Sequence, residues 1–270
     1  MAADPLPLEI DAALRATASA RGIFGTRVFY FTETGSTNDV AALAAERGEP
    51  DGTLVIAAAQ TAGRGRLGRT WYSPPGAGLY VSAVLRDAAI APWLTLAGGV
   101  GVAEGLRAAT GLPVQLKWPN DVVATAGPAF RARRKLAGIL AEASSTSDGL
   151  QSVVLGFGIN VRADAFPPEL GDRATSLEVE LGRPVDGGPV LGHVLVALNR
   201  AVMNLSGGRV DEVLRRWRAL APSSTGASVE WDTPDGVRAG VTAGLDADGA
   251  LLVRNGTGME RIISGEIRWL

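Results

Sequence analysis

The chain has 270 residues, and its 26 basic and 28 acidic side chains give a formal net charge of −2. This near balance gives no electrostatic reason to expect nucleic acid as the main partner, and 46% hydrophobic residues argue against a disordered or fibrous chain. The sequence contains no cysteine and a single histidine, His193. It therefore excludes disulfides, cysteine nucleophiles and metal sites built from thiolates or paired histidines, and we expect no protein-built metal site.

Targeting and membrane signals are also missing from the sequence. The N-terminal residues have neither the basic flank nor the apolar core of an export signal. No run approaches the roughly 18 uninterrupted apolar residues of a membrane span. The most apolar window, 93–103, is short and interrupted by glycines, which predicts a buried helix. We expect a cytoplasmic protein that does not bind membranes.

Hydrophobic periodicity predicts helices and strands in alternation along the first third of the chain. In chain order these are a helix over 8–21, a strand over 27–32, a helix over 36–48 and strands over 54–59 and 79–85. Ser36 and Asp39 have the spacing of a capping box at the start of the second helix. Residues 60–78 are rich in Gly, Arg and Pro and predict a long loop. Such loops are usually functional or mobile.

The middle of the chain predicts strands that follow one another without helices between them. A helix over 93–110 precedes strands over 114–118, 135–143 and 150–161, and two amphipathic helices follow over 186–205 and 210–220. This order favours antiparallel pairing. We therefore predict an α+β fold in which a mixed, largely antiparallel central sheet has helices packed against it over residues 1–220.

The composition changes after residue 221. Three hairpin-turn signals fall within fifty residues, namely Asp235-Gly236, Asp248-Gly249 and Asn255-Gly256. They predict a small β-barrel-like domain over residues 221–270.

The Gly- and Arg-rich loop contains two misleading phosphate-binding patterns. Its glycines fit both a dinucleotide fingerprint and, over 63–70, a P-loop with arginine in place of lysine. Both motifs need a helix to begin at the loop, and Pro74-Pro75 prevents one. What remains is three guanidinium groups framed by glycines, those of Arg64, Arg66 and Arg69. Their clustering favours anion binding over a merely solvated loop.

Lysine occurs at only two positions, Lys117 and Lys135, so 24 of the 26 basic residues are arginine. In such a chain, the positions that keep lysine are candidates for needing a compact ammonium group, with chance retention as the alternative. Lys117 opens the motif KWPND, and Lys135 opens KLAGIL. His193 has no motif around it and is given no role.

Taken together, five motifs in this order resemble those of biotin protein ligases. They are STND at 36–39, GRGRLGRTW at 63–71, KWPND at 117–121, RKLAGIL at 134–140 and GFGINV at 156–161. The segment containing Gly265-Glu266-Ile267 is similar to that family's C-terminal SH3-like domain. The resemblance implies that biotin and ATP form biotinyl-5′-AMP and that a carrier lysine then accepts the biotin. Mg²⁺ is expected to arrive on the ATP phosphates.

The resemblance also implies roles for the matched residues. Lys135 would bridge the biotin carboxylate and the α-phosphate, and Arg66 would help to hold the intermediate, so these two are the predicted catalytic residues. The predicted biotin-binding residues are Ser36, Thr37, Asn38, Gln60, Gly63, Arg64, Gly65, Arg66, Lys135 and Gly138. The predicted ATP-binding residues are Arg69, Trp71, Lys117, Asn120, Asp121 and Asn160. Trp71 would stack on or cover the adenine, and Asp121 is the candidate general base.

The partners implied are biotin carboxyl carrier domains of acyl-CoA carboxylases and pyruvate carboxylase. The first predicted strand begins near residue 27, too early for the winged helix-turn-helix of the family's repressors. We therefore expect no DNA binding and a monomer or weak ligand-dependent dimer. Two departures stand out, Leu67 at an often basic position and a long basic stretch over 124–134. A lipoate ligase on the same scaffold and a non-catalytic sensor of biotinyl-AMP remain alternatives.

Overall fold

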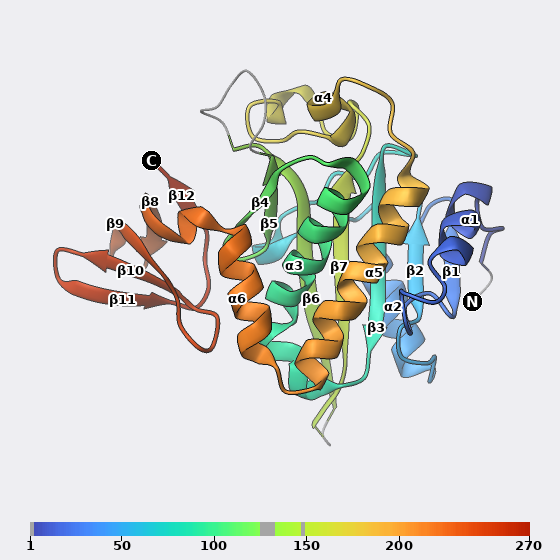
Figure 1. Ribbon diagram of the computed structural model, residues 1–270, viewed down its shortest axis with the longest axis horizontal. Coiled ribbons are helices and arrows are strands. Elements are labelled where there is room, and N and C mark those ends of the chain that lie inside the picture. The colour runs from blue at the N-terminus through green and yellow to red at the C-terminus, as the bar shows by residue number, and fades with distance from the viewer. Residues whose placement is uncertain (1–2, 125–132, 147–148) are drawn as a thin grey trace.

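The computed structural model describes residues 3–124, 133–146 and 149–270 and contains two sheets (Figure 1). The seven-stranded sheet has the order β1 (Val28–Phe31), β2 (Leu54–Ala57), β3 (Gly78–Leu85), β7 (Gly149–Asn160), β6 (Lys135–Thr146), β5 (Asp121–Ala124) and β4 (Val114–Lys117). The five-stranded sheet has the order β11 (Gly258–Ile262), β10 (Leu251–Asn255), β9 (Gly236–Leu245), β8 (Thr225–Thr233) and β12 (Ile267–Trp269). The helices are α1 (Leu8–Ala16), α2 (Thr37–Glu46), α3 (Ala91–Thr110), α4 (Leu177–Leu181), α5 (Gly187–Ser206) and α6 (Val210–Leu220).

The large sheet is mixed but largely antiparallel, as predicted. Strands β1 and β2 pair in parallel because α2 connects them as a crossover. The other neighbours, from β2–β3 through β7–β6 to β5–β4, are antiparallel. Within the second sheet, the three Asx-Gly turns separate β8, β9, β10 and β11, which confirms them as hairpins.

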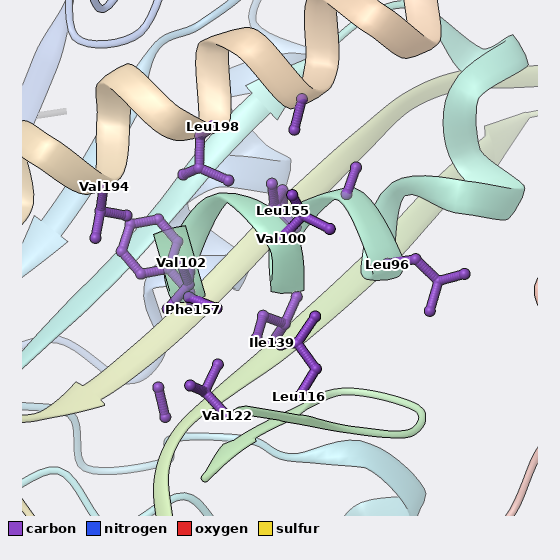
Figure 2. Packing of buried hydrophobic residues seen from close by; sticks show 14 of the residues in the cluster. Leu96, Val100, Val102, Leu116, Val122, Ile139, Leu155, Phe157, Val194 and Leu198 are labelled. Atoms are coloured by element: carbon purple, nitrogen blue, oxygen red, sulfur yellow. The ribbon is translucent and has the colours of Figure 1, made fainter. Parts of the chain in front are cut away.

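The main core lies between the large sheet and the layer of α3 and α5 (Figure 2). Val100 and Val102 of α3 lie among Ile139, Leu155 and Phe157 of β6 and β7, while Val194 and Leu198 approach from α5. By length and composition alone, Ala88–Thr110 could cross a membrane, but two thirds of its most apolar window is buried. The predicted buried helix is therefore confirmed.

Glycines let α3 and α5 approach each other closely. A Cβ atom at Gly101 would lie 2.5 Å from the Leu198 side chain, and one at Gly105 would lie 2.4 Å from Val194 Cα. The backbone of α3 at these glycines therefore packs against both backbone and side-chain atoms of α5, and Gly101, one of the glycines that interrupt the apolar window, serves packing.

Helix α2 covers part of the opposite face of the sheet. Its Ala41, Ala44 and Ala45 pack on Val55, Val84 and Val154 in a small second cluster that also includes Phe29. Beyond this helix, the same face of β6 and β7 lines a cavity with glycines. The helix layer therefore builds stability on one face, while the other face is open to a ligand.

Two predicted local features are wrong. The first helix ends at Ala16 rather than near Arg21, because the Thr17 hydroxyl and the Arg21 Nε donate to the carbonyls of Ala13 and Leu14. The predicted capping box does not form among residues 3–124: Ser36 occupies the N-cap position, but its side chain makes no cap hydrogen bond there.

Two elements were not foreseen, strand β5 directly after the KWPND turn and the short helix α4. The unusual 124–134 stretch lies mostly outside the described residues.

Candidate active site

Two adjoining cavities lie on the α2 side of the large sheet. The first spans about 430 Å³, including space open to solvent, and is lined by Ser36, Thr37, Asn38, Gln60, Arg64, Gly65, Trp71, Asn120, Lys135, Gly138, Ile139, Leu140, Gly156, Phe157 and Gly158. The second spans about 580 Å³, again including space open to solvent, and is lined by Gly65, Arg66, Leu67, Arg69, Thr70, Trp71, Lys117, Trp118, Pro119, Asn120, Asp121, Lys135, Gly265, Glu266 and Ile267. We call these the strand cavity and the charged cavity. They share Gly65, Trp71, Asn120 and Lys135, so they meet at the predicted catalytic lysine.

A β-bulge aims Lys135 into this junction. Val122 pairs with Ala137 but Val123 pairs with Lys135, so Leu136 is an extra residue on β6. Leu136 and Ala137 both belong to the main core. In a regular strand Lys135 would share the face of Ala137 and point into the core, because side chains alternate. The bulge moves Lys135 to the face of Gly138 instead.

Within the described part of the chain, the Lys135 ammonium contacts a carboxylate and an aromatic ring. Its Nζ lies 2.6 Å from Asp121 Oδ1 and 5.2 Å from the centroid of the Trp71 ring. A Cβ atom at Gly138 would lie 3.2 Å from Nζ, so the glycine leaves room for the lysine side chain across the strand. Incoming anions could replace Asp121 at this ammonium.

The floor of the strand cavity is made by glycines on neighbouring strands. A Cβ atom at Gly158 would lie 2.4 Å from Trp71 Nε1, and one at Gly156 would lie 2.2 Å from Asn38 Oδ1. These side chains therefore lie directly on the backbone of β7. Trp71 Nε1 is buried and has no hydrogen-bond partner among the described residues, which leaves a donor for a ligand.

A hydrogen-bonded group of polar side chains closes the other end of the strand cavity. Gln60 Oε1 accepts from the Thr37 N–H at 2.8 Å, and Gln60 Nε2 donates to Ser73 Oγ at 2.9 Å. Ser82 Oγ donates to Asn38 Oδ1 at 2.5 Å. The start of α2 is thus held by side chains of the loop and of β3, in place of the predicted capping box.

The three loop arginines have different surroundings. Arg64 donates to Asp39 and Glu142, at 2.6 and 2.9 Å, which raises the pKa of its guanidinium. Arg69 pairs with Glu266 at 2.5 Å, which raises the pKa of Arg69 and lowers that of Glu266.

Arg66 lies between these two arginines along the loop. It makes no ion pair among the described residues, and partial burial lowers its pKa. Arg66 is therefore the loop arginine whose charge is available to a ligand.

The charged cavity also contains Lys117, held by the last strand. Its Nζ lies 5.3 Å from the ring centroid of Trp269, and the Arg133 guanidinium carbon lies 4.1 Å from the same ring. Burial lowers the pKa of Lys117, and the nearby carboxylates of Asp121 and Glu266 oppose that shift. The C-terminal sheet thus completes a cavity whose other walls come from the large sheet.

Most of the predicted site residues converge on the two cavities, including both lysines. Gly63 and Asn160 line neither of them. Gly63 packs against the Trp71 backbone, and Asn160 Nδ2 donates to the Thr175 carbonyl at 2.9 Å. Their direct roles with ligands stay predictions.

Sequence reasoning missed four residues that hold the site together. Glu142 accepts hydrogen bonds from Asn38 and Arg64, at 2.5 and 2.9 Å. Ser82, Glu266 and Trp269 hold Asn38, Arg69 and Lys117. Glu142 had a usable signal, because it lies on the pocket-facing side of β6 with Gly138 and Leu140.

Comparison with known proteins is consistent with this geometry. Residues 28–160 match the biotin/lipoate A/B protein ligase family, and residues 229–268 match the biotin protein ligase C-terminal domain. The chain is 34% identical over 250 residues to the bifunctional ligase/repressor BirA of Bacillus spizizenii, covering 91% of this chain and 74% of that protein. It is 32% identical over 241 residues to the biotin–[acetyl-CoA-carboxylase] ligase of Paracoccus denitrificans, covering 87% of this chain and 97% of that protein.

A solved structure has the same fold. The biotin protein ligase from Aquifex aeolicus in complex with biotin and ATP superposes with a TM-score of 0.75 at 30% identity, covering 91% of this chain and 99% of that one. Sequence and structure agree over nearly the whole length of the described chain, and both extend into the C-terminal sheet. The chain belongs to the biotin protein ligase family.

Proposed function

We infer that this protein is a biotin–[acetyl-CoA-carboxylase] ligase. It activates biotin with ATP to give biotinyl-5′-AMP and pyrophosphate, and it transfers biotin to a lysine of a carboxyl carrier domain. The observation that carries this conclusion is the position of Lys135 at the junction of a largely uncharged cavity and a cationic one. One cavity suits a small neutral head group with an acid tail, and the other suits a polyphosphate.

The first step must bring two anions together. The biotin carboxylate attacks the α-phosphorus of ATP, and pyrophosphate leaves. We propose that Lys135 replaces its contact with Asp121 by contacts to the carboxylate and the α-phosphate, while Arg66 stabilises the charge that develops on the phosphate. A fixed donor of this kind contributes on the order of 10²–10³ in rate.

The proposed binding roles follow the cavity walls. The polar group around Thr37, Asn38 and Gln60 would hydrogen-bond the ring system of biotin, and Trp71 would stack on or cover the adenine. Lys117, Arg69 and Asn120 would face the nucleotide. Ser36, Gly65 and Gly138 would complete the biotin side.

Proton transfer in the second step is assigned to Asp121. The carrier amine attacks the acyl carbon of the mixed anhydride and AMP leaves, so one proton must leave the nitrogen. Once Lys135 binds the substrate anions, the Asp121 carboxylate loses its present partner. It is then available to accept that proton.

Mg²⁺ would enter as part of the nucleotide. The carboxylates of the charged cavity, Asp121 and Glu266, are each paired with a cation. No group of three metal-ligating side chains occurs among the described residues. These residues fit a cation held by the phosphates rather than by the protein, and such an ion neutralises phosphate charge.

We further propose that residues 1–220 form the ligase domain and 221–270 an SH3-like domain that supplies Glu266 and Trp269 to the nucleotide side. Carrier domains of acyl-CoA carboxylases and of pyruvate carboxylase are the expected partners. We propose that the protein acts in the cytoplasm, as a monomer or weak ligand-dependent dimer, without binding DNA.

The decisive experiment is the mass shift of a purified carrier domain incubated with this protein, ATP and biotin. We expect the carrier to gain one biotinyl group, and we expect pyrophosphate to be released from ATP in a step that needs biotin but not the carrier. Calorimetric titration with biotin and with lipoate tests the alternative substrate. Binding of lipoate alone would contradict the proposal, and biotin binding without pyrophosphate release would indicate a non-catalytic sensor.

A further inference from the structure

Lys135 keeps its pairing with Val123 of β5, but it lies beyond the part of β6 that pairs with β7. Pairing between β6 and β7 begins at Ala137, which lies opposite Ile159, so Lys135 extends past the paired part of β7. The backbone of Lys135 therefore needs partners from elsewhere in the chain.

Segment 173–175 supplies these partners. The Lys135 N–H donates to the Arg173 carbonyl at 2.8 Å, and the Thr175 N–H donates to the Lys135 carbonyl at 2.9 Å. The N–H and the carbonyl of Lys135 are thus both hydrogen-bonded to segment 173–175. The segment takes the place that β7 would occupy if it were longer.

Thr175 is fully buried and uses each of its polar groups. Besides the N–H, its hydroxyl donates to Glu180 Oε1 at 2.6 Å, and its carbonyl accepts from Asn160 Nδ2 at 2.9 Å. Asn160 is the last residue of β7, so this bond joins segment 173–175 to the sheet.

Glu180 links segment 173–175 to the start of β6. Its side chain is only 2% exposed, and the same Oε1 that accepts from Thr175 also accepts from Arg134 Nη2 at 2.8 Å. Arg134 immediately precedes Lys135 in the chain. One buried carboxylate therefore ties both the neighbour of Lys135 and the segment that holds its backbone.

A buried ion pair is weak evidence for stability, because a well-packed apolar pair often stabilises as much. The ion pair between Arg134 and Glu180 instead fixes the position of the chain next to Lys135. A displacement of about 1 Å at a reacting group can lower a rate by about 10². Glu180, Thr175 and Arg134 all lie outside the lining of both cavities.

We propose that Glu180, acting through Thr175 and Arg134, is a positioning residue for Lys135 in adenylate formation. This inference rests on the proposed function. Two variants test it. Thr175→Val removes the hydroxyl at similar volume, and Glu180→Gln removes the charge. Thr175→Ser keeps the hydroxyl. Glu104→Gln is the matched control, because Glu104 pairs with Arg216 between α3 and α6 and lines neither cavity.

Biotin-dependent pyrophosphate exchange measures the effect. In Thr175→Val and Glu180→Gln, kcat should fall about tenfold or more, while KM for biotin and ATP stays within about threefold. Thr175→Ser and Glu104→Gln should stay within about threefold of wild type in both parameters. An unchanged kcat in the two test variants, or an equal loss in Glu104→Gln, would overturn the proposal.

A second readout does not depend on activity. The chain has only two lysines, so acylation by an amine-reactive acetate ester followed by peptide mass spectrometry gives the ratio of Lys135 to Lys117 labelling. Weakening the contacts by which segment 173–175 and Glu180 restrain Lys135 should raise this ratio at least about twofold in the two test variants and leave it unchanged in the controls. An unchanged labelling ratio would contradict the proposed positioning of Lys135, whether or not the wild-type protein makes adenylate. Failure of the wild-type protein to make adenylate would instead refute the proposed function.

Discussion

The two cavities that meet at Lys135 are built in opposite ways. The strand cavity is shaped by backbone, with Trp71 and Asn38 lying directly on glycines of β7, and its polar contacts are mostly hydrogen bonds between neutral groups. The charged cavity is shaped by cations, with Arg66, Arg69 and Lys117 on its walls.

This difference predicts how each cavity responds to substitutions and to salt. In the strand cavity an added methyl group collides with closely packed atoms, and the effect of that collision hardly depends on salt. Attraction between exposed charges weakens gradually and is screened at ordinary ionic strength. Variants on the strand side should therefore act strongly and independently of salt, and variants on the charged side weakly and with a marked salt dependence. Lys135 belongs to both cavities and should be the most sensitive position.

Lys135→Ala should show the largest effect. It removes the ammonium at the junction, and the rate of biotin-dependent pyrophosphate exchange should fall by about 10²–10³. The loss of the contact to Asp121 involves two partly exposed groups, so the free energy of unfolding should change by no more than about 1 kcal/mol. Melting curves and exchange rates measured on the same preparation test this. A loss of thermal stability in proportion to activity would show that the lysine is structural.

Gly158→Ala should come next. The added Cβ would lie 2.4 Å from Trp71 Nε1, so the indole must move. We expect a loss of about 1–3 kcal/mol in unfolding free energy and weaker biotin binding at every salt concentration, measured by calorimetry.

Gly256→Ala is the matched control, because no residue that the structure describes lies within 4 Å of a Cβ there. Unchanged biotin affinity in Gly158→Ala would contradict the view that backbone contact shapes this cavity.

Residues that a local sequence pattern marks could be predicted, whereas residues placed by packing between distant segments could not. Motif residues such as Gly138 and Asn120 converge because each motif ends or begins a strand whose partners follow from antiparallel order. The Asx-Gly turns of the C-terminal sheet are local signals and are found where predicted.

The face to which Lys135 points depends on one extra residue at Leu136, and no local pattern marks that residue. Glu266 and Trp269 meet Arg69 and Lys117 across more than 145 residues of chain. Such contacts depend on how the two sheets pack, which residue spacing does not encode.

The charged cavity can be tested through the pKa of Lys117. Burial lowers this pKa below the usual 10.5, so the ammonium loses its proton at a lower pH than an exposed lysine. The KM for ATP should therefore begin to rise below pH 10.5, and Lys117→Arg should move that rise to higher pH.

A higher pH weakens ATP binding through Lys117 but increases the stability of the fold. Between the folded and unfolded pKa values of Lys117, the unfolded chain binds more protons than the folded chain. The contribution of Lys117 to the free energy of unfolding therefore increases with pH. A KM for ATP with the same alkaline limb in wild type and in Lys117→Arg would exclude Lys117 as the titrating group.

The smallest effect is expected at the contact between the two sheets. Arg69 and Glu266 are 60% and 40% exposed, so their ion pair should contribute no more than about 1 kcal/mol and should be screened by salt. Arg69 lowers the pKa of Glu266. The contribution is therefore complete above the unfolded pKa near 4.5 and is lost as the pH falls through the folded value.

Glu266→Gln should remove this pH-dependent part of the unfolding free energy. It should also tighten ATP binding about two- to fivefold at low salt, because Arg69 no longer has to leave a carboxylate and one negative charge is gone from the cavity. Asp232→Asn breaks a comparable ion pair to Arg268 on the same sheet and should leave ATP affinity unchanged. Weaker ATP binding in Glu266→Gln would mean that the carboxylate holds Arg69 in its binding position, and the charged cavity would then depend on fixed geometry as much as the strand cavity does.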